Sequence, residues 1–452
     1  MKKLVALLLS AMMLCACCAA LAEVPEGYPE VVPGIDFGGA EVLILDYWSG
    51  DSYKVANPSE QQLATYAFHD WINAAYNVKA DQLQGGDWGS CAEEMINFTG
   101  TPDGSLRMYI IEPGKVVSLV SNGIASPIST KYIDLTADKW NDAEIDFMTV
   151  GGTLYGLYAG NSEPRGCLYF NKRVLEEAGI DWNTIYDLQA EHKWTWAVFE
   201  EMLAQITKDT DNDGINDIWG LLGSGDDAYV LSVFSNNGCF FDFDENGKLY
   251  PAMNSNETLE ALTWFKDIQS KYWAPQPEGS NWDWYKNAWT QGYCGFYVYQ
   301  TYGGFNDNSE MADMADDWGC VAWPIPADSE EYTYVTIVSD NITLIPAVYD
   351  EETVAKLAFL YDLWTEPAPG YDDDDAWIGN KYNYTDDRAV DETYAMLREA
   401  EHCRVNKVLY LGTQNDVIGS SLLWSLSGST PAELIEAAMP TWQALCDTFN
   451  AK

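Results

Sequence analysis

The sequence is poor in basic residues and in histidine. Lys and Arg number 24 against 70 Asp and Glu, the formal net charge is −46, and there are three histidines. A surface this acidic repels phosphate backbones and anionic head groups, so neither nucleic-acid binding nor direct adsorption to a membrane is expected. The chain also lacks HExxH, GxSxG and Walker motifs, so it carries no signature of a zinc protease, a serine hydrolase or a nucleotide-binding enzyme.

The cysteines form no recognisable site either. Three of the ten lie in the N-terminal leader, at positions 15, 17 and 18. The other seven are widely spaced and include no CxxC pair, which argues against a zinc cluster and against a dense disulfide framework. They are Cys91, Cys167, Cys239, Cys294, Cys320, Cys403 and Cys446. We expect them to be unpaired thiols that pack as small hydrophobic side chains.

The N-terminus has the layout of a secretory signal. Lys2 and Lys3 precede an apolar run and then small residues, so residues 1–22 are predicted to be a signal peptide. The letters ALA before residue 23 suit ordinary signal peptidase, whereas LCAC resembles a lipoprotein box that would place a lipid anchor on Cys17. No later segment has the roughly 18 to 20 apolar residues of a spanning helix. We expect a protein secreted to the extracellular face of the membrane, lipid-anchored there, or to the periplasm, with 23–37 as a flexible spacer.

The stretch 154–223 is the most informative part of the remaining chain. A strand and a crossover lead to Asn171, which can cap a short helix that ends at Gly179, and Thr195 can cap a second helix. Apolar residues of that second helix recur at i, i+3, i+4 and i+7, which predicts a buried stripe. An Asp-rich loop and another strand follow. With 452 residues, the chain is long enough for two lobes of α/β size.

This order of elements resembles the bacterial extracellular solute-binding proteins of sugar ABC importers, family 1, which are maltose-binding-protein-like. The resemblance implies an α/β, two-lobe, periplasmic-binding-protein-like (type II) fold with two mixed β-sheets flanked by helices and a hinge crossed about three times. It implies an N-terminal lobe of residues 38–158 plus 302–365 and a C-terminal lobe of residues 159–301 plus 366–452. The strand near residues 318–324 is accordingly expected in the N-terminal lobe. A helix is also expected from Pro58 to Ala75, with Leu63, Tyr66, Ala67 and Trp71 on one side.

Carbohydrate binding needs flat aromatic faces for the apolar side of a sugar ring, and carboxylates or amides for its hydroxyls. The chain has 19 Trp and 28 Tyr, and many of them follow predicted strands, where ligands bind in open α/β sheets. The predicted ligand-binding residues are Tyr47, Trp48, Asp51, Trp88, Glu112, Asn161, Glu163, Arg165, Trp284, Tyr299, Tyr302 and Trp424, with Asp87, Thr301 and Trp377 as further candidates.

The loop from Asp209 to Asp217 has the ligand spacing of an EF-hand calcium loop. Side-chain oxygens stand at positions 1, 3, 5 and 9, and Gly214 stands at position 6. The metal ligands would be Asp209, Asp211, Asp213, the carbonyl of Ile215, and Asp217. Gly220 replaces the bidentate Glu at position 12, so both structural Ca²⁺ and a solvated Asx-rich turn remain open. No other cofactor is expected.

Together these features predict the extracellular substrate-binding component of an ABC transporter. It would capture a monosaccharide or oligosaccharide between its lobes and deliver it to the membrane permease as a monomer, without breaking a bond, so it is not expected to be an enzyme. Two alternatives stay open: a secreted carbohydrate-active enzyme of the glycosidase type, because carboxylates and aromatics also build such clefts, and a calcium-dependent glycan adhesion protein.

Overall fold

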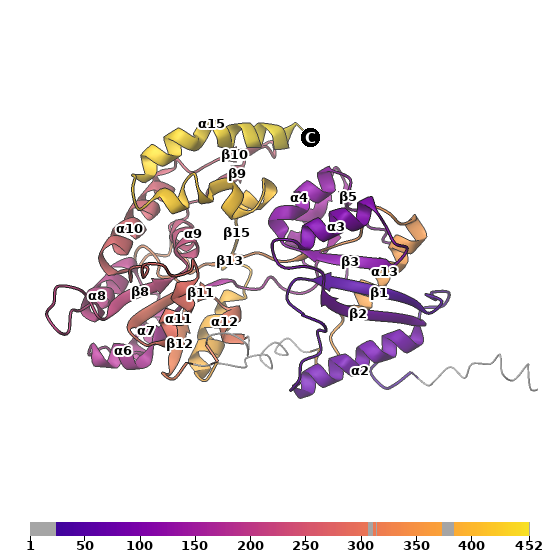
Figure 1. Ribbon diagram of the computed structural model, residues 1–452, viewed down its shortest axis with the longest axis horizontal. Coiled ribbons are helices and arrows are strands. Elements are labelled where there is room, and N and C mark those ends of the chain that lie inside the picture. The colour runs from indigo at the N-terminus through magenta and orange to yellow at the C-terminus, as the bar shows by residue number, and fades with distance from the viewer. Residues whose placement is uncertain (1–23, 306–310, 313, 373–383, 452) are drawn as a thin grey trace, which may run out of the picture.

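The computed structural model describes residues 24–305, 311–312, 314–372 and 384–451. Figure 1 shows two lobes side by side, joined by segments that run between them. Each lobe is built on its own mixed β-sheet with helices on both faces. The predicted two-lobe α/β fold is therefore confirmed.

The first lobe, on the right in Figure 1, contains a five-stranded sheet in the order β2-β1-β3-β14-β6. Its strands are β1 (Ala40–Asp46), β2 (Val78–Gln84), β3 (Leu106–Ile111), β6 (Gly156–Leu157) and β14 (Ile342–Leu344). β1 pairs in parallel with β2 and β3, whereas β14 runs antiparallel to β3 and β6. Since side chains alternate along a strand, β1 buries residues on both faces of this sheet.

Helices cover both faces of the first sheet. They are α2 (Glu60–Ala75), α3 (Cys91–Gly100), α4 (Pro113–Ser121), α5 (Asp142–Met148) and α13 (Glu351–Trp364). Val42 and Ile44 of β1 share one apolar cluster with α2 and α13, and Leu45 shares the other with α3 and α4. A short hairpin of β4 (Thr149–Val150) and β5 (Thr153–Leu154) follows α5.

The second lobe is built on a four-stranded sheet in the order β12-β7-β11-β8. Its strands are β7 (Gly166–Asn171), β8 (Trp219–Gly223), β11 (Cys294–Gln300) and β12 (Trp318–Val321). Its helices include α6 (Lys172–Glu177), α7 (Asn183–Ala190), α8 (Trp196–Ile206), α9 (Gly225–Ser235), α10 (Asn256–Tyr272), α11 (Trp284–Thr290) and α12 (Tyr302–Phe305), and β9 (Phe241–Phe243) pairs with β10 (Leu249–Pro251).

The helix caps in this lobe are those that the sequence predicts. The Asn171 side chain accepts from the amide of Val174 at 3.1 Å, and the Thr195 hydroxyl accepts from the amide of Val198 at 3.4 Å. Gly179 follows α6 with φ = 82°, a left-handed conformation that glycine adopts without strain. Phe199 of α8 is among the residues with no exposed surface.

The chain passes between the lobes three times, after β6, between β12 and β14, and after α13. At the crossing, β13 (Thr336–Val338) pairs in parallel with β15 (Cys403–Val405). Pro164 forms an isolated bridge with Val338, so the outgoing and returning segments are hydrogen-bonded to each other. These short pairings are the hinge.

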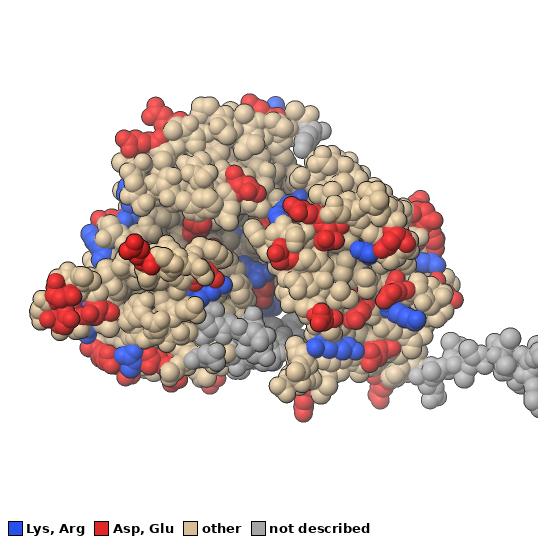
Figure 2. All heavy atoms as spheres, viewed as in Figure 1, with Lys and Arg blue, Asp and Glu red and all other residues tan. Residues whose placement is uncertain are grey.

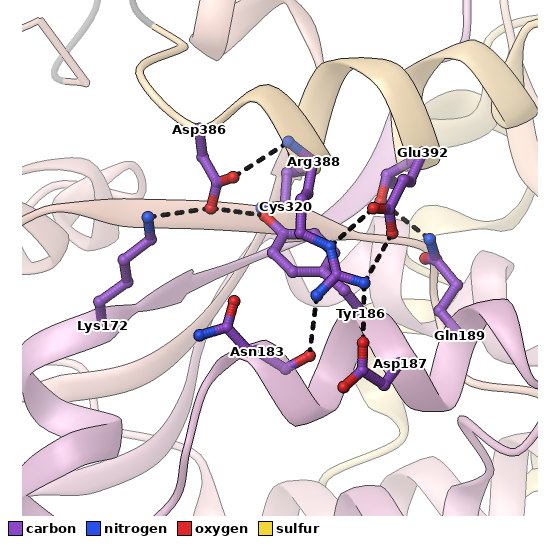
Figure 3. A network of polar contacts seen from close by, with 10 residues as sticks. Lys172, Asn183, Tyr186, Asp187, Gln189, Cys320, Asp386, Arg388 and Glu392 are labelled. Carbon is purple, nitrogen blue, oxygen red and sulfur yellow. Dashed lines mark hydrogen bonds and ion pairs between the residues drawn. The ribbon is translucent and has the colours of Figure 1, made fainter.

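The C-terminal segment returns to the second lobe through η2 (Ala389–Tyr394), α14 (Ala395–Leu397), η3 (Lys407–Tyr410), η4 (Asn415–Gly419), η5 (Leu423–Ser425) and α15 (Pro431–Asn450). Arg388 ties its start to α7 by donating to Asp187 at 2.9 Å and to Glu392 at 2.6 and 3.0 Å (Figure 3). Asp386 accepts from Tyr186 at 3.0 Å and pairs with Lys172 at 2.9 Å. This network joins the start of the C-terminal segment to α6 and α7 of the second lobe.

Three expectations from the sequence differ from the structure. β12 lies in the second lobe because it pairs antiparallel with β7, so the chain re-enters the first lobe only at β14. The buried face of α2 is formed by Phe68, His69 and Ile72, while Leu63 is 54% exposed, because the apolar stripe lies about one position further around the helix than predicted. The third difference is that residues 24–37, which were expected to form a flexible spacer, pack against the first lobe.

The segment 24–37 lies against the first lobe and is not a free tether over its whole length. The Tyr28 ring contacts Phe68 and Trp71 edge-on at 5.3 Å, and Ile35 is buried. The backbone amide of Val32 donates to the Tyr76 hydroxyl at 3.0 Å. Aromatic packing within the first lobe therefore holds residues that their Pro and Gly content alone suggests would be flexible. The signal peptide and Cys17 lie outside the described residues.

Candidate functional site

A hollow separates the two lobes, and Figure 2 shows charged atoms of both signs within it. The strands β8 and β11 are parallel, and β11 leads directly to Thr301, whose amide donates to the carbonyl of Arg165 at the hinge, 2.9 Å away. The carboxyl ends of these strands therefore face the crossing and the hollow. In open α/β sheets this is where loops can present side chains to a ligand.

Two aromatic residues after β1 form part of the first-lobe wall. The Tyr47 hydroxyl donates to Asn341 Oδ1 at 2.8 Å, and burial raises the pKa of Tyr47 to about 12, although the nearby Arg165 opposes this shift. The Trp48 ring meets the Tyr47 ring edge-on at 4.9 Å, and 52% of Trp48 remains exposed. Asp46 is fully buried and accepts from the amide of Trp48 at 3.0 Å, so the turn that presents this indole is fixed.

A second exposed indole, Trp88, follows β2. Lys115 Nζ lies 5.0 Å from the centre of the Trp88 ring and donates to the carbonyl of Gly89 at 2.8 Å. Asp87 accepts from the Ser90 amide at 2.8 Å, so its carboxylate holds the turn before α3. The cation on one face of Trp88 leaves it less suited than Trp48 to stack on a neutral sugar.

Glu112 lies at the end of β3 and caps α4. Its Oε1 accepts from the amide of Gly114 at 3.1 Å, whereas its Oε2 is buried and has no hydrogen-bond partner among the described residues. Burial raises the pKa of Glu112, while the Gly114 amide opposes the rise. A buried acceptor without a hydrogen-bond donor destabilises the folded state, so Glu112 Oε2 is available to accept a hydrogen bond from a ligand hydroxyl or from water.

The hinge contributes a compact charged group. Arg165 Nη1 lies 3.4 Å from Glu163 Oε2, and the amide of Glu163 donates to Asp340 Oδ1 at 3.2 Å. Burial raises the pKa of Asp340, and this rise is opposed by donors from Ser162 and Glu163 and by Arg165. The group links the strand leaving the first lobe to the strand returning to it, so its geometry depends on how the lobes are set.

In the second lobe, Trp424 is held flat at the surface. Its Nε1 donates to Asp226 Oδ2 at 2.9 Å, which fixes the rotation of the ring. Gly419 lies beneath the indole, and a Cβ at that position would be only 2.8 to 3.0 Å from three ring atoms. Because 55% of Trp424 is nonetheless exposed, the other face of the ring is open. This arrangement has the flat, fixed geometry that stacking on a sugar requires.

A group of tyrosines lies at the end of β11. The hydroxyls of Tyr299 and Tyr302 are 2.7 Å apart, and the Tyr285 ring lies 6.4 Å from the Tyr299 ring. Lys286 Nζ is 5.5 Å from the centre of the Tyr299 ring. Asp227 faces Tyr285, and burial raises the pKa of Asp227 to about 6. The second lobe thus combines tyrosine faces with two adjacent aspartates, Asp226 and Asp227.

The remaining predicted residues are placed less directly. Asp51 and Asn161 are exposed, and the carbonyl of Asn161 accepts from the Tyr158 hydroxyl at 3.3 Å. Trp284 lines a separate surface cavity of about 270 Å³ with Asp283 and Asn287. Thr301 is buried in the hinge. Trp377 lies outside the described residues.

Four side chains of this site are not among the residues predicted from the sequence, namely Asp226, Asp227, Tyr285 and Lys286. Residues 223–227 read GSGDD, a Gly-rich stretch without the Lys-Ser/Thr of a phosphate-binding loop, so the sequence alone assigns these residues no function. In the structure, Ser224 caps α9, which begins at the carboxyl end of β8, so both aspartates lie in the first turn of the helix at that edge of the sheet. A predicted strand-to-helix turn with two carboxylates was the available signal.

The Asp-rich loop lies apart from this cleft, between α8 and β8. One carboxylate oxygen each from Asp209, Asp211 and Asp217 lies within 4.8 Å of the others. The carboxylate of Asp209 accepts from the amides of Asn212 and Gly214 at 2.7 and 2.8 Å, and the Gly214 amide lowers the pKa of Asp209. Three ionised oxygen ligands fit a hard cation such as Ca²⁺.

The other two predicted ligands of that loop are not part of the group. The Asp213 carboxylate accepts from the amide of Ile215 at 2.8 Å and is not among the three carboxylates that lie within 4.8 Å of one another. The carbonyl of Ile215 stays a predicted ligand, and the Ile215 side chain is exposed. The geometry therefore supports three of the five predicted ligands.

The described residues also bear on the wider class of protein. No helix among them is both long and apolar enough to cross a bilayer. The seven cysteines in the described ranges are free thiols, as expected, and five of them are buried.

Comparisons with known proteins agree with the fold. The chain is 28% identical over 127 residues to lipoprotein LipO of Bacillus subtilis, covering 26% of the chain and 23% of that protein. It is 25% identical over 139 residues to the arabinooligosaccharide-binding protein of Halalkalibacterium halodurans, covering 30% of the chain and 27% of that protein. The matches thus span about a quarter of the length of these curated relatives.

A solved structure is similar over almost the whole chain. It is the ABC substrate-binding protein Lmo0181 of Listeria monocytogenes in complex with cycloalternan, with a TM-score of 0.60 at 15% identity, covering 91% of this chain and 98% of that chain. Residues 55–361 match the family described as bacterial extracellular solute-binding protein. This match spans more than half of the sequence, and the two-lobe fold agrees with it. The chain belongs to the family of bacterial extracellular solute-binding proteins.

Proposed function

We propose that this protein captures a carbohydrate in the cleft between its lobes and delivers it to the transmembrane permease of an ABC transporter. The observation that carries the proposal is the Trp424 indole, which is fixed by Asp226 and Gly419 and open on its outer face. A flat aromatic face beside a carboxylate suits both sides of a sugar ring, the apolar C–H face and the hydroxyls.

The first lobe offers complementary groups on the other side of the hinge. Trp48 supplies a second exposed indole, and Glu112 supplies a buried oxygen in need of a donor. A curated relative is named for binding an arabinooligosaccharide, and a structurally similar protein is in complex with cycloalternan. Both names support an oligosaccharide as the ligand of this chain.

The mechanism follows from two lobes joined by short strands. A ligand that touches both lobes stabilises the closed arrangement by the contacts that the open arrangement cannot make. The permease can then recognise the loaded protein by its shape. No bond of the ligand is broken in this mechanism, so the protein acts as a receptor and not as an enzyme. One copy of the chain contains both lobes of the cleft, so we expect it to act as a monomer. A lipid on Cys17 would keep it at the extracellular face of the membrane.

Thermal shift across a library of monosaccharides and oligosaccharides tests this function. The expected result is a saturable rise in melting temperature with a subset of sugars, without release of reducing ends. Trp424→Ala should abolish most of that rise, while the control change Tyr250→Ala, on a ring of β10 that is 40% exposed, should not. Release of reducing ends would instead identify a glycosidase, and no response to any sugar would contradict the proposal.

We also propose that Asp209, Asp211 and Asp217 hold a structural calcium ion between α8 and β8. Such an ion stabilises the folded state by mass action, by about 2.7 kcal/mol at a hundredfold excess over Kd. Ca²⁺ should raise the melting temperature of the wild type and leave that of Asp211→Asn unchanged. An identical response in both proteins would contradict the site, and Asp244→Asn in a distant turn is the control.

The lipid anchor on Cys17 is a separate proposal, supported by the match to a protein named as a lipoprotein. Wild-type protein should partition with membranes on expression in a bacterial host that lipidates such signals. Cys17→Ala should shift it to the medium or the periplasm. Equal partitioning of the two forms would favour cleavage after residue 22.

A further inference from the structure

The second-lobe wall of the cleft carries two adjacent carboxylates whose charge is not balanced locally. Asp226 and Asp227 occupy the first turn of α9, and no Lys or Arg in the described parts of the chain forms an ion pair with either. The donor that Asp226 does have is neutral, the Trp424 indole N–H at 2.9 Å. Burial raises the pKa of both carboxyl groups, which shows that they are partly withdrawn from water.

Aromatic faces surround this pair. Burial, together with the charge of Asp227, raises the pKa of Tyr285, and the Tyr285 ring is 6.4 Å from the Tyr299 ring at an interplanar angle of 60°. The Tyr302 ring lies 5.5 Å from the Tyr299 ring on the other side, and Trp424 adds its open face. Electron-rich faces at steep angles around carboxylates are the arrangement that attracts an ammonium group.

The protein itself shows that this wall accepts an ammonium. Lys286 Nζ lies 5.5 Å from the centre of the Tyr299 ring and 5.9 Å from that of the exposed Trp282. No ion pair between Lys286 and Asp226 or Asp227 is found in the described part of the chain, so this ammonium contacts aromatic rings and does not neutralise the two carboxylates. The first lobe adds the buried Oε2 of Glu112, which has no hydrogen-bond partner among the described residues, whereas Asp226 and Asp227 accept from neutral donors.

We infer that the sugar that binds in this cleft carries a protonated amine, which Asp226, Asp227 and the tyrosine wall receive. The inference rests on the proposed function and specifies its ligand as an amino sugar or an oligosaccharide that contains one. An ammonium supplies three donors and a full positive charge, whereas the hydroxyl of a neutral sugar supplies one donor and none. A uronic acid or a sugar phosphate would place like charges together and is disfavoured.

Matched ligand series test this selectivity. Isothermal titration would compare oligosaccharides of equal length that carry an amine, an acetamide or a hydroxyl at C2, which are chitosan, N-acetylated chitosan and cellulose oligomers, with galactosamine, N-acetylgalactosamine and galactose alongside. The amine form should bind about tenfold more tightly than the hydroxyl form. Equal or weaker binding of the amine form would overturn the inference while leaving the sugar receptor intact.

Variants locate the effect. Asp226→Asn and Asp227→Asn keep the shape of the side chain and remove the charge, so the ratio of the affinity for the amine form to that for the hydroxyl form should fall toward unity. The melting temperature without ligand is the control for folding. Glu260→Gln on the exposed side of α10 should keep the full preference. A preference that survives both Asn changes would contradict the assigned residues. If no sugar in this series or in the wider library binds, the proposed function itself fails.

Discussion

Gly419 should control the stacking platform without touching the ligand. A Cβ at this position would lie 2.8 to 3.0 Å from three atoms of the Trp424 ring, whereas carbon atoms pack at about 3.5 to 4.0 Å. In Gly419→Ala the indole must therefore move by about 0.7 Å or more. That movement lengthens the 2.9 Å bond from Nε1 to Asp226 and tilts the open face.

The expected cost to sugar binding is about 1 to 2 kcal/mol, from a weakened hydrogen bond to a carboxylate and a misaligned stacking face. This corresponds to a loss of affinity of roughly 5-fold to 30-fold. Isothermal titration with a sugar identified by the library screen measures it. Melting temperature reports the fold separately, because alanine alone would favour the helical turn by about 1 kcal/mol or less.

Gly428→Ala is the matched control in the same segment. A Cβ at Gly428 would meet only the carbonyl of Ser425, at 4.0 Å, so its affinity should equal that of the wild type. Two results would contradict this prediction. Wild-type affinity in Gly419→Ala would mean that the Trp424 ring accommodates the methyl group, and wild-type affinity in Trp424→Ala would mean that the sugar does not stack on the indole.

Two further predictions concern stability. Burial, together with the charge of Asp340, raises the pKa of Glu144 to about 8, so the folded state holds this proton more tightly than the unfolded chain and wild-type stability falls as the pH rises from about 4.5 to about 8. In Glu144→Gln the free energy of unfolding, measured with urea, should lack that part of the decline and exceed that of the wild type by a few kcal/mol at pH 8. Parallel curves of unfolding free energy against pH for the two proteins would disprove this. Arg388→Ala should lower the free energy of unfolding by about 1 to 3 kcal/mol and expose residues 384–410 to protease. Arg404 donates only to neighbouring backbone carbonyls, so Arg404→Ala should do neither. Equal digestion of both variants would contradict the role of the Arg388 network.

Local signals in the sequence predicted much of the fold. Asn171 and Thr195 cap their helices through contacts three residues away, and such contacts can be inferred from neighbouring letters. The lobe of β12 could not be inferred in this way, because its antiparallel partner β7 is about 150 residues earlier in the chain and buried strands of both lobes look alike. The packing of Tyr28 on Phe68 likewise depends on tertiary contacts.

The site was predicted unevenly for a similar reason. Tyr47, Trp48 and Glu112 follow strands β1 and β3, and the rule that ligands bind at the carboxyl ends of strands is enough to select them. Asp226 and Asp227 follow β8 in the same way, but α9 is buried on almost every side and shows no amphipathic pattern that would mark where it begins. Gly419 could not be selected at all, because its importance depends on the position of Trp424.

Small-angle X-ray scattering with and without a bound sugar tests whether the two lobes close on the ligand. Saturating ligand should reduce the radius of gyration of the wild type as the lobes close, whereas Trp424→Ala should show no reduction at the same ligand concentration. A bound sugar, demonstrated by titration in the same sample, with an unchanged scattering curve would contradict closure of the two lobes on the ligand.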